Sequence, residues 1–554
     1  MPGRQTRQSI FAKMKDEAGS ALRSRRKYPE RPGAKGPPRP SIPATRLSAR
    51  RRYADGPKPP LPGPFRGDRP KMQFVPSTIL ALAVLVALAV LGPRRGLWVF
   101  LATTPFGAAA AFNLPAAGGA SILVSDLAAL MMFAMLWVQP DAPARITGSM
   151  RAYQPGFWML LFVVVCVISA LFFPRLFQGA TNVFGLSRAN NEVGIVEIPL
   201  HPTNGNLTQL FRILLDAAAF FALATAFRLR PDARGVIVAV AVASFVSAGL
   251  GWLDVLSFDI GMPNLLAPIQ TANYAILSNV SMAGLKRMIG GFPEASAFGY
   301  YTLGLFAFWL HMWVARGRSW LVSLALIATT VALLRSTSSS AYVAAAVFVL
   351  GYGALRMTRY DGRGVSRRGL AVTLGLAGGI ALALMALGLA YLTIEPVSAF
   401  LDRSLFDKMG TASGVERMSW NTQAWANFLD TRGIGAGLGS MRASNWVLAS
   451  LGSIGVIGTG LFLTFVATLA RAPLGAEPER AAVIGALKSG CLALFISANL
   501  TAPTPDLGVF FFAMAGLAAG LSRGAQRESL EQAEAAAPGN WRRRGANLER
   551  IGGL

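Results

Sequence analysis

The chain has 554 residues, 53% of them hydrophobic and only 14% charged, whereas soluble globular proteins have about 25% charged residues. Its formal net charge at pH 7 is nevertheless +26, and residues 1–73 carry +14 of this charge through 19 basic and 5 acidic side chains. The rest of the chain is mostly apolar. These values exclude a soluble enzyme, argue against a nucleic-acid-binding protein and indicate a protein that crosses a membrane several times.

Residues 1–73 contain 13 prolines, so we expect a basic, disordered cytoplasmic tail without a packed core. An alternative is a short basic amphipathic helix on an anionic membrane leaflet. It would use apolar residues at helical spacing, which are Ile10, Phe11, Met14, Ala18 and Leu22. The first apolar run begins only near Phe74, so no cleavable signal peptide is expected.

Residues 74–522 contain apolar runs that each approach the ~20 residues needed to cross a bilayer as a helix. The sequence therefore predicts an all-α polytopic membrane domain, followed by a cytoplasmic C-terminal tail at 523–554. The thirteen candidate runs lie near 74–91, 97–112, 120–138, 156–173, 208–227, 234–255, 294–315, 318–334, 338–357, 369–393, 444–470, 480–500 and 506–522.

Basic residues in short loops orient these runs, because Lys and Arg gather on the cytoplasmic side of membrane proteins. Three arginine-bearing loops fall on one side if every intervening run crosses once, namely 228–234, 316–318 and 356–368. The loops that then lie outside are 174–207, 256–293 and the large loop 394–443.

Thirteen crossings would place the basic N-terminal tail outside, so one early run is expected not to cross. The weakest is 97–112, which is short and interrupted by Thr104-Pro105-Phe106-Gly107. We therefore predict twelve crossings, with both termini in the cytoplasm.

Cysteine and histidine are too sparse to indicate a disulfide framework or a metal site. Cys166 and Cys491 both lie inside apolar runs, and His201 and His311 are far apart in the sequence. We expect neither a metal nor another cofactor.

Ionisable residues at membrane depth are candidate functional sites because their burial is costly. The first candidate is Lys286-Arg287 followed by Gly290-Gly291-Phe292-Pro293-Glu294 at the start of a membrane helix. Arg287 could bind an anion beside Glu294 as a potential base. Alternatively, Glu294 caps the helix, and the two cations lie among lipid headgroups.

The second candidate is Arg335, which precedes the five hydroxyl residues Ser336 to Ser340. A guanidinium and hydroxyl donors could hold a phosphate, or Arg335 could simply extend to the membrane interface from a helix end.

A further candidate is Arg212, with Asp216 four residues later on the same predicted helix. The two residues could be a structural ion pair or part of a polar cavity.

The third candidate runs from Glu416-Arg417 through Trp420 to the glycine-rich segment 433–440. Its alternating glycines, which include Gly435, Gly437 and Gly439, would let backbone amides approach an anion closely. No βαβ unit surrounds them, so they are not a dinucleotide fingerprint.

In their order and spacing, these segments resemble the superfamily of O-antigen ligases and polysaccharide polymerases (WaaL-like, Wzy-like and ExoQ-like membrane proteins) over roughly residues 200–465. The matching patterns are Arg287 to Ala297, Leu334 to Ala341, Glu416-Arg417-x-x-Trp420 with the glycine-rich segment, and Asn445 to Gly458. The resemblance implies a GT-C-like fold and a metal-independent, inverting glycosyltransferase. Its donor would be a glycan linked to undecaprenyl pyrophosphate.

By this resemblance, Arg287, Arg335 and Arg417 would bind the pyrophosphate, and Arg212 is a further candidate. WaaL-like ligases have a His-Asn pair where this chain has Ser444-Asn445. The missing histidine favours a polymerase over a ligase. Glu294 is the first candidate for the general base and Glu416 the second.

We therefore expect an enzyme that polymerises lipid-linked repeat units into exopolysaccharide or O-antigen. One alternative is a ligase that transfers the glycan to lipid A core or to protein. A second alternative is a transporter or flippase of the same intermediates, which would show internal repeats and broken helices. Expected partners are the glycan donor, the glycan acceptor and membrane lipids, with a flippase and a chain-length regulator as further candidates.

Overall fold

A computed structural model describes residues 72–114, 120–139, 141–187, 194–278, 280–282, 285–317, 319–358, 388–395 and 412–536, together with a few single positions between 375 and 398. These described residues belong to one compact unit. The predicted N-terminal tail, the run 369–393, most of the loop 394–411 and the C-terminal arginines lie wholly or largely outside the described residues.

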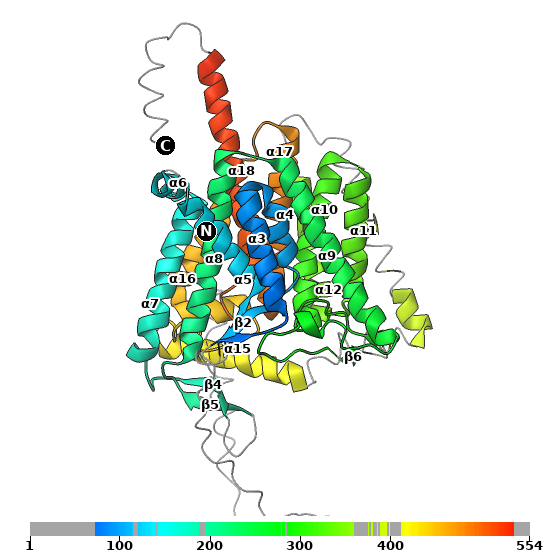
Figure 1. Cartoon of the computed structure of the whole chain (residues 1–554). Helices are drawn as coiled ribbons and strands as arrows, with labels where there is room; N and C mark the ends of the chain where they lie inside the picture. Colours follow the sequence, from blue (N-terminus) through cyan, green and yellow to red (C-terminus); the bar gives the residue numbers. More distant parts are fainter. Residues whose placement is uncertain are drawn as a thin grey trace, which may run out of the picture. The chain divides into compact units, whose positions relative to one another are not determined.

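The described residues are mainly helical (Figure 1). The helices are α3 (Ser77–Arg95), α4 (Leu97–Thr103), α5 (Val124–Trp137), α6 (Ala142–Thr147), α7 (Pro155–Leu176), α8 (Asn204–Leu229), α9 (Ala233–Asp259), α10 (Ala295–Arg316), α11 (Trp320–Arg335), α12 (Ser339–Thr358), α15 (Ala412–Asp430), α16 (Trp446–Arg471), α17 (Pro478–Thr501) and α18 (Val509–Ala536). A short 3-10 helix covers Ala267–Ile269.

Six helices in the described part of the chain are long and apolar enough to cross a membrane: α3, α7, α8, α9, α16 and α17. Shorter apolar helices occur at Val124–Trp137, Trp320–Arg335, Ser339–Leu355 and Val509–Gly524. On α3, large apolar side chains at helical spacing remain exposed, which are Ile79, Leu82, Val86 and Val90. Such a continuous exposed stripe is suited to lipid rather than water. The prediction of a helical membrane protein is therefore confirmed at this level.

The run 97–112 does not form a membrane-spanning helix. Its helix, α4, has only seven residues and is about 10 Å long, well short of the ~30 Å hydrocarbon core. The chain then continues into strand β2 (Ala110–Leu114). This agrees with the prediction that this run fails to cross.

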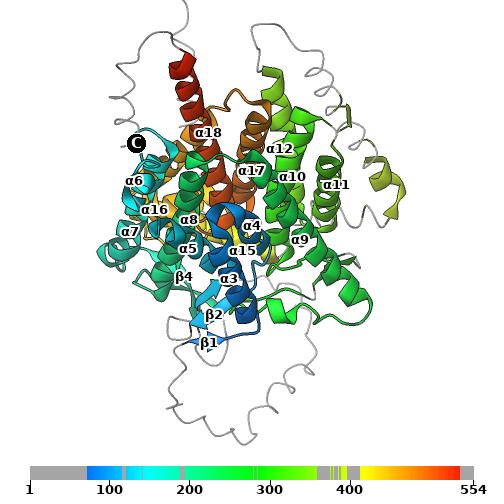
Figure 2. The same ribbon diagram turned by 45° about the horizontal axis from the view of Figure 1, so that its top comes forward.

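The helices differ greatly in how far they are buried. The most apolar window of α8 is 83% buried, whereas that of α3 is 22% buried. Helix α8 packs against α18, α5 and α7, and α10 packs against α17, α11 and α12. Phe220 on α8, with Phe462 and Phe465 on α16, joins an aromatic cluster in this core. Helix α8 is thus largely buried among other helices, whereas α3 is largely exposed and lies beside α4 at the front of the view in Figure 2.

The structure also contains several short strands, which were not predicted from the sequence. Strands β1 (Gln73–Phe74), β2 and β3 (Ala120–Leu123) form an antiparallel sheet in the order β1-β2-β3. Strands β4 (Asn182–Ser187) and β5 (Gly194–Pro199) form a hairpin, and β6 (Ser281–Met282) pairs with β7 (Leu285–Lys286).

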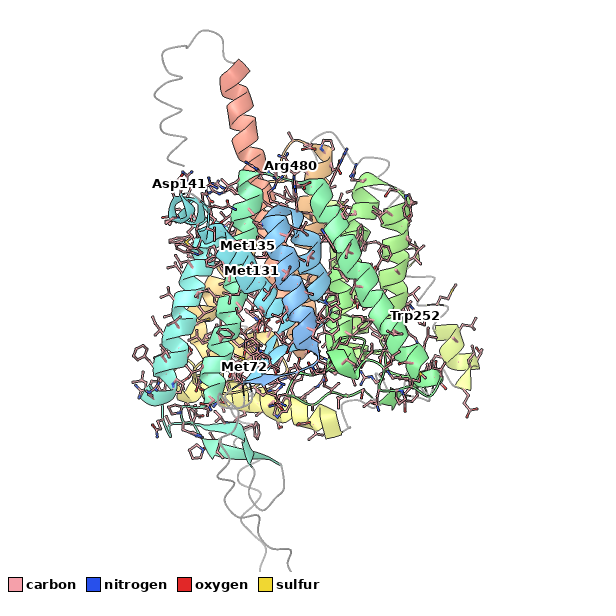
Figure 3. All side chains as sticks on the ribbon, in the orientation of Figure 1. Met72, Met131, Met135, Asp141, Trp252 and Arg480 are labelled. Atoms are coloured by element: carbon pink, nitrogen blue, oxygen red, sulfur yellow. The ribbon has the colours of Figure 1, made fainter. Side chains whose placement is uncertain are left out.

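Helix α15 and the β4–β5 hairpin lie together at one end of the helices (Figure 1). The Nδ2 of Asn427 on α15 donates to the backbone oxygen of Asn182 at 2.7 Å, and the hydroxyl of Thr181 donates to Asp430 at 2.6 Å. We call this the α15 end. The opposite end, where α8, α10 and α16 finish and α17 begins, is called the distal end; it includes Arg480 (Figure 3).

Candidate functional site

A buried ion pair holds the loop that begins at β7. The Nζ of Lys286 contacts Asp254 on α9, and the two side chains are only 2% and 5% exposed. The second carboxylate oxygen of Asp254 accepts hydrogen bonds from the backbone N–H groups of Ile289 at 2.8 Å and Gly290 at 3.2 Å. Lys286 therefore does not lie among lipid headgroups. It fixes the segment 287–293 between β7 and α10, which we call the Arg287 loop.

Arg287 is half-buried and has cationic and anionic neighbours. Burial lowers the pKa of its guanidinium, the nearby carboxylate of Glu294 opposes this shift, and the nearby Arg417 lowers the pKa further. The Nε of Arg287 is buried without a hydrogen-bond partner in the described part of the chain. Arg287 is thus a partly desolvated cation with unused hydrogen-bonding capacity.

Glu294 is the N-cap residue of α10, as one reading of the sequence predicts. Its backbone is extended, but its side chain makes no capping hydrogen bond to the helix. The carboxylate instead accepts a hydrogen bond from the hydroxyl of Ser296 and lies near Arg287. The carboxylate of Glu294 is therefore not used to cap α10, and its negative charge acts on Arg287.

Arg335 ends α11 and also contacts this loop. Its Nη1 donates to the backbone oxygen of Lys286 at 2.7 Å. The next four hydroxyl residues, 336–339, are buried, and the hydroxyls of Ser336 and Thr337 donate to backbone oxygens of the same turn. These two hydroxyls stabilise the turn instead of extending towards a ligand. Arg335 itself is brought to the same place as Arg287.

The turn after Arg335 is strained and closely packed. Thr337 has a φ of +51°, a conformation that is rare for a β-branched residue and costs about 1–3 kcal/mol. A Cβ atom on Gly299 of α10 would lie 2.7 Å from the Cβ of Ala341. A glycine is therefore needed where α10 passes this turn, and this contact fixes Arg335 relative to Glu294.

Helix α15 supplies Arg417 but keeps Glu416 apart. Arg417 is half-buried, and its positive charge is near enough to Arg287 to repel it. Glu416, by contrast, is exposed. Exposed apolar residues form a stripe on another face of α15, which are Val415, Met418, Trp425 and Leu429. The helix thus carries a basic residue towards the site and presents an apolar surface beside it.

The glycine-rich segment packs against a break in α16. Gly435, Gly437 and Gly439 all have positive φ values, as does Gly455 inside α16. The backbone amides of Ala436 and Gly437 donate to the carbonyls of Gly452 at 2.7 Å and Ser453 at 2.9 Å.

Two further amides of the glycine-rich segment also have partners within the protein. Gly435 donates to the hydroxyl of Thr431 at 3.0 Å, and Leu438 donates to the hydroxyl of Ser169 at 3.0 Å. The glycines thus allow close backbone packing, and these amides are not available to an anion.

Asn445 caps α16. Its side-chain oxygen accepts from the N–H of Leu448 at 3.1 Å, and its amide donates to the carbonyl of Asn499 at 2.7 Å. Its side chain therefore joins α16 to the end of α17.

Arg212 lines a separate cavity of about 430 Å³ at the α15 end, together with Asp126 and residues of β2 and β3. It forms no direct ion pair with Asp216. Its ionisable neighbours are Asp126, Asp506, Tyr274 and Asp216. Asp216 is buried, and its Oδ2 has no hydrogen-bond partner in the described residues. The polar-cavity interpretation of Arg212 therefore fits better than a simple i,i+4 ion pair.

This cavity and the Arg287 loop are joined through residues 107–110. The N–H of Ala108 donates to the carbonyl of Gly291 at 2.7 Å, and the carbonyl of Ala108 accepts from Thr271 and Ala272. The hydroxyl of Tyr274, a neighbour of Arg212, donates to the carbonyl of Gly107. Hydrogen bonds of Gly107 and Ala108 thus connect the surroundings of Arg212 with the Arg287 loop.

Three acidic residues near these arginines were not predicted from the sequence, namely Asp126, Asp254 and Asp506. Asp126 lies in the first turn of α5, and Asp254 lies within α9. A charged residue in an apolar helix is costly to bury, so this pattern in the sequence could have identified both. Asp506 follows the apolar run of α17 and accepts from the N–H of Gly508 at 2.6 Å. Its proximity to Asp216 depends on how α8 packs against α18, which sequence alone does not reveal.

The two histidines lie away from these residues. His201 is exposed and its Nδ1 contacts the carbonyl of Pro199 at 2.9 Å, while His311 lies near the distal end of α10. Among the described residues, no group of three or more His, Cys, Asp or Glu side chains has the arrangement of a metal site. Cys166 and Cys491 are buried free thiols.

The chain matches no family model and no curated protein.

Proposed function

We propose that this protein is a membrane glycosyltransferase that polymerises glycan repeat units carried on undecaprenyl pyrophosphate. The observation that carries the proposal is the convergence of Arg287, Arg335 and Arg417 on one loop beside Glu294. These residues come from three separate segments of the chain, in the order that resembles the O-antigen ligase and polysaccharide polymerase superfamily. The proposal includes a twelve-span, GT-C-like architecture in a bacterial inner membrane with both termini in the cytoplasm.

The charge of this group suits a pyrophosphate. Arg417 lies close enough to Arg287 to disfavour the charged form of the Arg287 guanidinium, and an anion bound between the two would offset this penalty. A guanidinium donates several hydrogen bonds to phosphate oxygens. Fixed cations also stabilise the charge that develops on a leaving pyrophosphate.

The apolar stripe on α15 supports a lipid-linked substrate. Val415, Met418 and Trp425 are exposed on the helix that also supplies Arg417. An amphipathic helix of this kind is suited to the interface between lipid and water. A donor whose polyprenyl chain lies in the membrane would reach the arginines from that surface.

In the proposed reaction, a sugar hydroxyl of the acceptor attacks the anomeric carbon of the donor. The bond from that carbon to the pyrophosphate oxygen breaks, and the configuration at the carbon inverts. Glu294 accepts the hydroxyl proton, while Arg287, Arg335 and Arg417 bind the departing pyrophosphate. We place Glu294 before Glu416 because Glu294 lies near Arg287 and Glu416 is exposed.

A ligase would use the same arginines with another acceptor. A transporter is favoured by one observation, the break in α16 at Gly455, since broken helices often form transport sites. However, the N–H of Val456 donates to the carbonyl of Gly433 at 3.0 Å, and Ser453 accepts from Gly437. The backbone groups at the break are thus already used, which favours a structural role for the break.

The test compares Arg287→Ala and Arg417→Ala with Arg175→Ala. Arg175 is an exposed arginine at the same end, and its side chain donates to its own helix. Loss of either site arginine should reduce chain extension from purified lipid-linked repeat units by about 100-fold or more, with Arg175→Ala near wild type. Normal chain length from both site variants, with normal amounts in the membrane, would disprove the assignment.

The lipid-linked species that accumulate in deletion cells separate the alternatives. Single repeat units would support a polymerase, and long chains still attached to the lipid would support a ligase. Repeat units that remain on the cytoplasmic side would support a flippase.

A further inference from the structure

A second cavity, of about 390 Å³, lies near the distal end of the helices. Helices α10, α12, α16 and α17 surround it together with the α16–α17 connection. Most of its lining is apolar and includes Leu355, Val466, Leu469, Leu474 and Leu492. This volume is within the range of small-molecule and lipid sites, about 300–1,000 Å³.

The charged residues in the lining are both basic. Arg471 and Lys488 contribute to the wall, and no Asp or Glu does. Lys488 is held in place because its Nζ donates to the carbonyls of Ala470 and Ala472. Arg471 is exposed at the end of α16. The cavity is therefore apolar inside with two cations on its wall.

The nearby acidic residues pair with other arginines. Glu479 contacts Arg316 at 2.9 Å and Arg234 at 3.8 Å, and Glu477 contacts Arg480 at 3.0 Å. None of the described carboxylates lies within ion-pair distance of Arg471. The charge of Arg471 is therefore not neutralised by a carboxylate in the described part of the chain.

The remaining polar residues of the wall are organised around His311. Its Nδ1 lies 2.9 Å from the hydroxyl of Ser489 and 3.2 Å from that of Tyr352. A Cβ atom on Gly485 would lie 2.3 Å from the Nε2 of His311. Close packing thus fixes this side of the cavity.

We propose that this cavity binds an acidic glycerophospholipid. Its phosphate contacts Arg471 and Lys488, and part of an acyl chain lies among Val466, Leu469 and Leu492. Basic pockets between membrane helices bind anionic headgroups in this way on the cytoplasmic side. The distal end carries Arg230, Arg234 and Arg316, which belong to the loops predicted to be cytoplasmic. This site is separate from Arg287, Arg335 and Arg417, which lie at the opposite end of the helices.

The test uses the full-length protein in detergent and counts bound phosphatidylglycerol and phosphatidylcholine by native mass spectrometry. Wild type should retain phosphatidylglycerol in preference to phosphatidylcholine. A basic residue near the membrane contributes about 1 kcal/mol to anionic lipid binding, so Arg471→Ala should weaken phosphatidylglycerol binding about fivefold. Arg230→Ala, an exposed arginine also at the distal end, is the matched control and should bind like wild type.

A third variant tests the apolar part of the site. Leu492→Trp leaves both cations in place but fills part of the cavity, so it should lower phosphatidylglycerol retention while the protein remains monodisperse in gel filtration. Equal retention of the two lipids by wild type would overturn the proposal. So would Arg471→Ala binding like Arg230→Ala, or Leu492→Trp binding like wild type.

Discussion

Replacing Asp254 should release the loop that carries Arg287. In the folded protein, this carboxylate binds the ammonium of Lys286 and the backbone N–H groups of Ile289 and Gly290. Asp254→Ala removes the anion and leaves Lys286 buried without its ion-pair partner. The two backbone N–H groups also lose their acceptor.

The expected cost follows from these contacts. Breaking a buried ion pair by removing one partner costs about 3–5 kcal/mol, mainly because the remaining charge is desolvated. Hydrogen bonds to a charged acceptor contribute about 1.5–3 kcal/mol each, although part of this is already included in the first value. A local cost of about 4 kcal/mol corresponds to a roughly thousandfold increase in the open population of the loop.

Hydrogen–deuterium exchange measures this effect directly. The amides of Ile289 and Gly290 should exchange far faster in Asp254→Ala, while amides in the centre of α8 should exchange as in wild type. The double variant Asp254→Ala/Lys286→Met should recover much of the protection, because it removes the unpaired charge. Unchanged exchange at 289–290 in Asp254→Ala would refute the argument that the ion pair fixes the loop.

Two further predictions concern α16 and the topology. Gly455 has a φ of +66°, and a Cβ atom there would lie 2.2 Å from the carbonyl oxygen of Ile434, whereas nothing lies within 4 Å of one on Gly460. Gly455→Ala should therefore lower the thermal unfolding temperature through a loss of about 2–4 kcal/mol, and Gly460→Ala should not; equal temperatures would contradict the packing argument. A cysteine at Gln178 should react with a membrane-impermeant maleimide on intact spheroplasts, and one at Arg230 only after permeabilisation. The native cysteines are buried and should give little background, and the reverse labelling pattern would overturn the orientation.

The helical membrane character could be predicted from the sequence because long apolar runs have few alternatives in a bilayer, whereas the number of crossings stays a prediction. The same reasoning identified the short α4, since a proline and a glycine interrupt its run. It did not predict the strands at the α15 end. These strands are short, and the β4–β5 hairpin owes its position to contacts such as that between Asn182 and Asn427 on α15, far apart in the sequence.

The candidate site was predicted in part. The sequence selected Arg287, Glu294, Arg335 and Arg417, and the structure brings them together through the Arg287 loop. Residue type alone could not show that the glycine-rich segment uses its amides internally, because an anion-binding loop and a tightly packed turn require the same positive φ values. Only the hydrogen bonds from Ala436 and Gly437 to α16 distinguish the two.

The arginines of the two ends differ in how their charge is balanced. At the distal end, Arg234, Arg316 and Arg480 contact glutamates, so their positive charge is partly neutralised within the protein.

At the α15 end, neither Arg287 nor Arg335 forms an ion pair with a described carboxylate, and the nearby Arg417 adds a further like charge. Glu294 supplies one nearby negative charge, so the three arginines remain in excess. Keeping this excess in a partly buried site is unfavourable unless a further anion joins it. This imbalance is the physical reason to seek a polyanionic substrate there, and it does not depend on which glycan the substrate carries.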